Sequence, residues 1–359
     1  MDLKTSNNFF NYSTSLPGIL FKLNCSIAIS TYQAGKVIIV SSLDGKHLRM
    51  YGKSFVRPMG MCVSGDKLAV VAQHKLQVFS SSRKMAVGFP LKPKFHDGVF
   101  LPQVTYYTGK ADMHEIDWGD EGLWAVNTAF SCLSLMDEAN HFKPMWKPPF
   151  ITGLTPDDRC HMNGLAMQTG KPKIVSMLGT TDTKKGWKAN MLEGGILVDV
   201  TDDSVLADKL PIPHSPQFDE NGDLIFLLSG TGNIMRRSTA TGKIQKIGSA
   251  NAFVRGMDLY KDMIFVGKSS LRKTSTMYDL LSFPKDINPG VGIFDKETGE
   301  EMAQINFLQR VTEIFDVKIM PGLIRPIIVD ETDEIATKAF KLPGGGFFWE
   351  SPGTEKKEA

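Results

Sequence analysis

The sequence predicts an all-β fold, a six-bladed β-propeller whose ring is closed by strands from both ends of the chain. A strand–turn–strand pattern recurs six times, starting at residues 59, 114, 161, 214, 255 and 313, so that consecutive starts lie 55, 47, 53, 41 and 58 residues apart. Each interval leaves room for four short antiparallel strands, which is the size of a propeller blade. The N-terminal residues supply the strand-like sequence that the last copy lacks.

Each copy begins with a distinctive residue, followed by an apolar strand, a turn rich in Gly and Asp, and a second, more strongly apolar strand. The fourth copy starts at His214 and reaches its second strand at Leu224-Ile-Phe-Leu-Leu228. Short apolar runs bounded by Gly, Asp and Asn are typical of strands joined by tight turns. The sixth copy starts at Glu313 and continues into the apolar run Arg325–Val329.

Three strand-like segments near the N-terminus, 26–30, 36–40 and 47–51, complete the sixth unit. Pairing strands from both termini would close the ring and leave no free sheet edge between the first and last blades. Segment 16–23 is either a short helix or the first strand of a further unit, so a seven-bladed ring is the alternative. We expect one propeller domain over residues 1–341 and a flexible C-terminal tail over 342–359, where glycines and charged residues gather.

Charge and cysteine content exclude several classes of function. The 41 Lys and Arg residues nearly balance the 39 Asp and Glu residues, for a formal charge of +2, so we expect no nucleic acid or anionic membrane as partner. No apolar run approaches the ~20 residues of a membrane span, and residues 1–23 contain no secretory signal. The four cysteines, none in CxxC spacing, are expected to be reduced thiols of a cytoplasmic protein; they are Cys25, Cys62, Cys132 and Cys160.

The residues that start the six copies are expected to form a ring around one mouth of the central channel. In a propeller the first strand of each blade lines the channel and begins at the same face. The ring consists of Met59, His114, His161, His214, Arg255 and Glu313. Three imidazoles and a carboxylate suit a Zn, Fe or Mn ion, and the predicted metal ligands are His114, His161, His214 and Glu313. A divalent metal is therefore the expected cofactor.

A second ring lies three residues further along each strand. It consists of Cys62, Asp117, Gly164, Gln217, Asp258 and Asp316. Its carboxylates are expected to orient the imidazoles, and Asp117 or a histidine that binds no metal is a candidate for proton transfer. Two alternatives stay open for the first ring. Its histidines act in catalysis or binding without a metal, or they are structural, with Glu313 paired to Arg255.

The loops that follow the second strands are expected at the same mouth and are rich in polar, cationic and aromatic residues. The candidate substrate-binding residues are Gln33, Arg57, Asn127, Arg159, Asn163, Lys185, Trp187 and Arg272. Converging cations indicate a small anionic ligand. The two longest loops, 180–188 and 268–282, are predicted to fold over the histidines. Ser229-Gly-Thr-Gly232 lacks the Lys-Ser/Thr and the helix of a phosphate loop, so no nucleotide cofactor is indicated.

Several short motifs are distinctive in combination. They include Ser30-Thr-Tyr-Gln-Ala-Gly-Lys36, Asn127-Thr-Ala-Phe-Ser-Cys132, Asp158-Arg-Cys-His-Met-Asn-Gly164, Pro213-His-Ser-Pro216, Arg255-Gly256 and Glu313-Ile-Phe-Asp316. At these residues the chain resembles an uncharacterised, mainly bacterial family of propeller-like domains of unknown function, some of whose members are fused to tetratricopeptide repeats. The resemblance covers about residues 16–326 and implies the fold and a shared site, but no assigned activity. Glu115 stands where the family leads us to expect Asp.

Two functions of different classes follow. The first is an enzyme whose catalytic residues are the ring members His114, His161, His214, Arg255 and Glu313 together with Asp117. It would act on a small anionic substrate as a lyase, isomerase or hydrolase. The second is a non-catalytic propeller that presents its mouth to a peptide or protein partner. The sequence does not indicate an oligomeric state.

Overall fold

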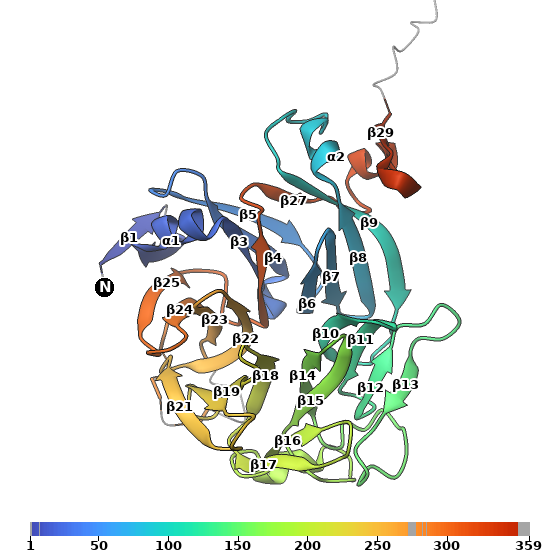
Figure 1. Ribbon diagram of the computed structural model, residues 1–359, viewed down its shortest axis with the longest axis vertical. Helices are drawn as coiled ribbons and strands as arrows, with labels where there is room; N and C mark the ends of the chain where they lie inside the picture. Colours follow the sequence, from blue (N-terminus) through green and yellow to red (C-terminus); the bar gives the residue numbers. More distant parts are fainter. Residues whose placement is uncertain (1, 7, 272–277, 282, 285, 351–359) are drawn as a thin grey trace, which may run out of the picture.

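Six sheets are arranged as blades around a central axis, in the computed structural model of residues 2–6, 8–271, 278–281, 283–284 and 286–350 (Figure 1). In four blades the strands follow one another in sequence order from the axis outward. These blades contain β6 (Pro58–Ser64), β7 (Lys67–Ala72), β8 (Lys75–Ser81) and β9 (Gly98–Tyr107); β10 (Met113–Gly119), β11 (Gly122–Asn127), β12 (Cys132–Leu135) and β13 (Lys143–Trp146); β14 (Met162–Gln168), β15 (Lys171–Met177), β16 (Gly195–Asp199) and β17 (Val205–Leu210); and β18 (Pro213–Phe218), β19 (Leu224–Leu228), β20 (Asn233–Arg237) and β21 (Ile244–Ser249).

The other two blades contain the N-terminal residues. One has the order β22 (Phe253–Tyr260), β23 (Met263–Ser269), β24 (Gly290–Asp295), β25 (Glu301–Phe307), β2 (Phe10–Ser13) and β1 (Leu3–Ser6). The last has the order β26 (Asp316–Pro321), β3 (Cys25–Ser30), β4 (Lys36–Ser42) and β5 (Leu48–Ser54). Antiparallel pairing of β26 with β3, from Asp316 opposite Ser30 to Pro321 opposite Cys25, closes the ring. The predicted six-bladed propeller, closed by both termini, is confirmed.

Segment 16–23 is a helix and not the first strand of a seventh blade. Helix α1 (Leu16–Leu23) has Pro17 in its first turn, where a proline costs no hydrogen bond, and ends at Asn24 in the left-handed conformation, with φ of 51°. Its buried residues Leu16, Leu20 and Leu23 are three or four positions apart and pack into the apolar cluster between the two closing blades.

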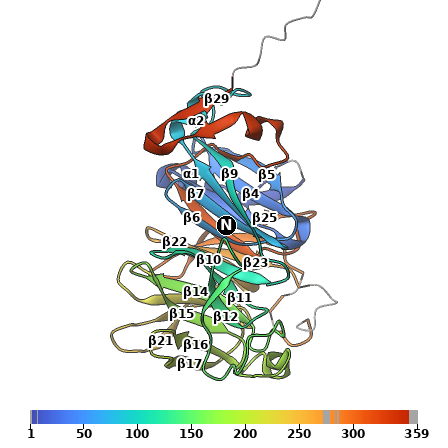
Figure 2. The ribbon, with the colours of Figure 1, turned by 90° about the vertical axis from the view of Figure 1, so that its right-hand side faces the viewer.

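The C-terminal residues leave the ring after β26. Strand β27 (Pro326–Ile328) belongs to the run expected to continue the sixth repeat, but it pairs in parallel with the outer strand β9 of the neighbouring blade. Short helices η3 (Glu334–Lys338) and η4 (Pro343–Gly345) accompany a hairpin of β28 (Ala339–Lys341) and β29 (Phe347–Trp349). Trp349 Nε1 donates to the carbonyl of Met85 in α2 (Arg83–Val87), so the hairpin and α2 lie together at one edge of the ring (Figure 2). The flexibility predicted for 342–359 stays a prediction, and residues 351–359 lie outside the described ones.

Inner strands shift register against the second strand of their blade near the place where they begin. Five of the six, β6, β10, β14, β18 and β22, contain such a bulge, for example between Met113 and Ile116. A bulge bends the strand and changes the direction in which its side chains point. His114, Asn163 and Arg255 lie within these bulges, which therefore place polar side chains of successive blades toward the axis.

In the bulge of β6 the next inner strand comes so close that only glycine fits. A Cβ atom added to Gly60 would lie 2.2 Å from the carbonyl oxygen of His114 in the next blade. We expect Gly60→Ala to lower the free energy of unfolding by ~3 kcal/mol, measured by urea denaturation, because backbone must move to admit the methyl group. The matched control is Gly52→Ala, since a Cβ at this β5 residue meets nothing within 4 Å. Equal effects of the two substitutions would contradict the close approach.

Among the described residues no helix is both long and apolar enough to cross a membrane.

Candidate functional site

His114 is a buried, neutral imidazole whose tautomer is set by its partners. Its Nδ1 lies 2.7 Å from Thr128 Oγ1 and 3.1 Å from the carbonyl oxygen of Asp112. The Thr128 hydroxyl has one proton, which it donates over 2.6 Å to the carbonyl of Met162 in the next blade. Nδ1 must therefore carry the imidazole proton, and Nε2 is unprotonated. Burial lowers the pKa of His114 to about 4, so the ring stays neutral at physiological pH.

His214 repeats this arrangement two blades further on. Its Nδ1 donates to Ser229 Oγ over 2.9 Å, and the Ser229 hydroxyl donates in turn to the carbonyl of Val254. Its unprotonated Nε2 accepts from Asn163 Nδ2 over 3.2 Å. Burial, followed by the nearby charge of Arg255, holds the pKa of His214 well below its usual value. Both nitrogens of this ring are satisfied within the protein.

Of the three histidines in the ring, His161 is the most accessible, with 16% of its side chain exposed. Its Nδ1 donates to the Asp158 carboxylate, with distances of 3.0 and 3.2 Å to the two oxygens. Trp187 Nε1 donates to the same carboxylate over 3.1 Å, and the indole lies against the imidazole with ring centroids 4.2 Å apart. The His114 ring lies on another side, 4.9 Å away between centroids. Asp158 and Trp187 thus fix both the tautomer and the position of His161.

Arg255 brings a positive charge to the same level of the channel. Its guanidinium lies over the ring of Phe315 at 3.9 Å and forms an ion pair with Glu313. Phe315 in turn contacts His114, with centroids 5.3 Å apart. Arginine stacked on an aromatic ring keeps most of its N–H donors available for a planar anion. The pairing of Glu313 with Arg255 was one of the alternatives left open by the sequence.

The predicted metal set is present at this mouth, but its members are engaged with other groups. All four residues are described, and among the described residues no group of three or more His, Cys, Asp or Glu side chains is arranged to hold a metal ion. The donors fit a metal in part, because Nε2 of His114 is unprotonated and Nε2 of His161 is the nitrogen that does not face Asp158, whereas Glu313 lies against Arg255.

The second ring does not orient the histidines, which corrects the sequence-based expectation. Its acids instead accept from backbone amides of the inner strands: Asp316 from Met61 in the next blade over 2.8 Å, and Asp117 from Trp118 over 2.8 Å. The Cys62 thiol also donates to Asp117, over 3.0 Å. The sequence did not single out Asp158, Thr128 and Ser229 as partners of the histidines. Asp158 lies three residues before His161, and this spacing was the available signal.

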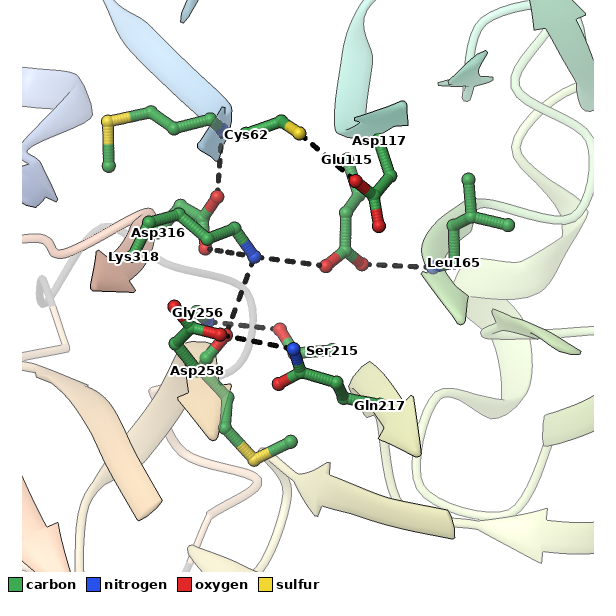
Figure 3. A network of polar contacts seen from close by, with 12 residues as sticks. Cys62, Glu115, Asp117, Leu165, Ser215, Gln217, Gly256, Asp258, Asp316 and Lys318 are labelled. Carbon is green, nitrogen blue, oxygen red and sulfur yellow. Dashed lines mark hydrogen bonds and ion pairs between the residues drawn. The ribbon is translucent and has the colours of Figure 1, made fainter. Parts of the chain in front are cut away.

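A polar cavity of about 220 Å³ lies further along the inner strands, away from the histidines. At its wall the ammonium of Lys318 lies 3.4 Å from Asp316 and 3.6 Å from Glu115 (Figure 3). Burial raises the pKa of Glu115 to about 8 and also raises those of Asp258 and Asp316. Burial lowers the pKa of Lys318, but the surrounding carboxylates outweigh this effect and raise it. Sequence analysis missed Lys318, although a lysine within the apolar run Val-Lys-Ile-Met is unusual.

The predicted loop residues are divided between this mouth and other places. Trp187 packs against His161 and belongs to the same apolar cluster as Leu281, so at these two residues the long loops share one cluster. Asn163 lies in the channel, and its Oδ1 accepts from Ser176.

The remaining candidates have partners within the protein or lie on the surface. Asn127 is buried and accepts from the Phe130 amide, and Gln33 accepts from Thr312. Arg159 is paired with Asp182 and Asp157, and Arg57 lies exposed beside Tyr32. Lys185 is exposed, and Arg272 lies outside the described residues.

Comparison with known proteins identifies the family but no activity. A search of the curated proteins finds no match. A chain of the nidogen/laminin complex superposes with a TM-score of 0.50 at 11% identity, covering 83% of this chain and 99% of that one. A protein of unknown function from Bacteroides caccae (TM-score 0.48, 9% identity, 82% and 98% covered) and a putative TolB from Agrobacterium tumefaciens (0.44, 13%, 85% and 93%) are also similar. The sequence matches the profile described as domain of unknown function (DUF4915) over residues 14–329, and the chain therefore belongs to that family.

Proposed function

We propose that the mouth lined by His114, His161 and Arg255, called the histidine mouth below, is the active site of an isomerase or lyase for a small carboxylate. The observation that carries this proposal is the Asp158–His161 pair. A histidine held by a carboxylate on Nδ1, with Nε2 on the other side of a partly exposed ring, is the arrangement of a general base. The guanidinium of Arg255 is the group that would bind the substrate carboxylate.

In the proposed reaction His161 Nε2 removes a proton from the carbon next to the carboxylate. The C–H electron pair stays on the substrate as an enolate, whose charge Arg255 stabilises. Asp158 stabilises the imidazolium that forms, because it accepts the Nδ1 proton throughout. In a substrate with a double bond beside that carbon, the imidazolium then returns the proton to the far carbon of the double bond, which shifts the double bond and is isomerisation. Otherwise the electron pair forms a double bond to the next carbon and expels a group from it, which takes the proton from the imidazolium and leaves; this is elimination.

Deuterium exchange tests this function before the substrate is known. We expect the protein, incubated in D₂O with a mixture of small carboxylic acids, to replace the C–H next to one carboxylate by C–D, as followed by ¹H NMR. His161→Asn should slow the exchange by ~10²- to 10⁴-fold because the base is lost. Asp158→Asn should slow it as well, because the imidazolium loses its partner. His141→Asn, an exposed histidine elsewhere, is the matched control. Exchange that persists in His161→Asn would rule out this base.

Metal binding at His114, His161, His214 and Glu313 is the second candidate for the same mouth. The unprotonated Nε2 of His114 favours it, as does the contact of Asp158 with Nδ1 of His161, because metal ions bind neutral imidazole nitrogen whose ring is oriented by a carboxylate. Stoichiometric Zn, Fe or Mn in the purified protein, lost in His161→Ala, would favour the metal. A peptide that binds the mouth, with no exchange of any acid, would favour a non-catalytic propeller.

We also propose that the protein is cytoplasmic. Its four cysteines are free and buried, which supports a reducing compartment.

A further inference from the structure

Hydroxyl groups at the ends of second strands connect neighbouring blades and, in two places, determine the state of a histidine. Each hydroxyl donates to a carbonyl at the start of the next inner strand. The four pairs are Ser30 with Met59, Thr128 with Met162, Ser229 with Val254, and Ser269 with Ile314. Only Thr128 and Ser229 also contact an imidazole, so the same inter-blade bond occurs with and without a histidine.

The proton of each hydroxyl is committed to a carbonyl, so the oxygen can only accept from the histidine. A carbonyl oxygen, of Asp112 or of Ile212, lies near the same Nδ1 and also can only accept. Both rings are therefore held with Nε2 unprotonated. His214 Nε2 already accepts from Asn163, whereas His114 Nε2 accepts a hydrogen bond from no residue that the structure describes.

A small recess is lined in part by His114. It has a volume of about 10 Å³, and its other lining residues are Asn163, His214, Arg255, Phe315, Glu115, Ser215 and Asp316. A space of this size holds one water-sized group, such as a hydroxyl. Because the partners of Nδ1 can only accept, the imidazole proton stays on Nδ1, and Nε2 of His114 is an acceptor for a hydrogen bond.

We propose that the substrate of the histidine mouth is a hydroxycarboxylate, whose carboxylate binds Arg255 and whose hydroxyl enters the recess and donates to His114 Nε2. This inference rests on the proposed function for the binding of the substrate carboxylate, and it adds a hydroxyl group to that substrate. A deoxy analogue would leave a buried acceptor without its hydrogen bond, and sites built to bind a hydroxyl reject such analogues strongly. Thr128 is then a positioning residue, because it holds His114 in the accepting tautomer.

Matched pairs of acids test the substrate class. Binding is measured by titration calorimetry with lactate against propionate, malate against succinate, and gluconate against hexanoate. We expect at least one hydroxy acid to bind ~100-fold more tightly than its deoxy partner. Thr128→Val should reduce that preference ~10-fold, whereas Ser269→Ala, which removes the same inter-blade bond without a histidine, should leave it unchanged. Absence of any preference, or of any binding, would overturn the substrate class.

The tautomer is measured separately, on the protein without ligand. In ¹⁵N-histidine NMR we expect His114 and His214 to keep the Nδ1–H tautomer from about pH 6 to 8, and His114 to lose it in Thr128→Val. A His114 protonated on Nε2 would overturn this inference even if His161 proved to be the base. Correct tautomers together with no deuterium exchange would instead count against the proposed function, so the two failures are distinguishable.

Discussion

Deletion of residues 1–41 is expected to abolish cooperative folding of the whole ring. The deletion removes β3 and nearly all of β4, so the inner strand β26 loses its six-residue pairing, from Asp316 opposite Ser30 to Pro321 opposite Cys25. It also removes the Ser30 hydroxyl, which donates to Met59 in the adjoining blade and accepts from the Asp316 amide. An opened ring exposes apolar inter-blade surface on both sides of the gap. Circular dichroism during heating should show no sharp transition.

A shorter deletion provides the control. Removing residues 1–8 takes away only the edge strand β1, which pairs with β2 and with no other strand. That change should lower stability by ~1 kcal/mol and the melting temperature by a few degrees. If the protein lacking residues 1–41 also melted cooperatively near the temperature of the full chain, ring closure by β26 and β3 would not hold the fold together.

The blades could be predicted because the second strand of each repeat is apolar on both faces and is followed by a turn. Such strands lie in the middle of a sheet, as in β19, which is buried along its whole length. The course of the chain after β26 could not be predicted. An apolar run such as Arg325–Val329 fits the outer strand of a neighbour as well as its own blade, and only three-dimensional packing decides between them.

The sequence indicated which residues form the ring at the mouth, but it did not indicate their hydrogen-bond partners. His114, His161 and Arg255 meet because equivalent positions of successive inner strands lie at the same height. Their hydrogen-bond partners depend on bulges and on residues with positive φ, such as Asp158 at 51° and His161 at 50°. Non-glycine residues adopt that conformation only where the surroundings compensate for its cost, so sequence patterns do not reveal it.

Lys318→Met is expected to lower the free energy of unfolding by ~3–5 kcal/mol at neutral pH, because it leaves buried carboxylates without their counter-charge. Lys318 lies between Glu115 and Asp316, and it also donates to the carbonyl of Met257 over 3.4 Å. Methionine keeps the length of the side chain, so packing changes little. Urea denaturation at several pH values measures the effect.

The loss in the free energy of unfolding that Lys318→Met causes should grow as pH rises. Burial already raises the pKa of Glu115 to about 8 in the folded protein, above the ~4.3 of an unfolded glutamate. A group with a raised folded pKa stabilises the fold fully below the unfolded pKa, and that contribution is lost as pH rises through the folded pKa. Without the ammonium the folded pKa rises further, so ionisation costs more. The parent and the variant lose this contribution in parallel up to the folded pKa of the parent, so the deficit that Glu115 adds should appear above about pH 8 and grow as the pH rises further.

A second substitution separates charge from packing. Glu115→Gln in the Lys318→Met background removes one stranded carboxylate, while the glutamine oxygen can still accept from the Leu165 amide, as Glu115 does over 2.9 Å. Above about pH 8 the double variant should regain the part of the lost stability that ionisation of Glu115 causes, whereas the part caused by Asp316 and Asp258 remains. Lys171→Met, at an exposed position that starts β15, is the control and should change stability by less than ~0.5 kcal/mol. A Lys318→Met variant whose deficit is the same at every pH would mean that lost packing, and not unbalanced charge, destabilises it.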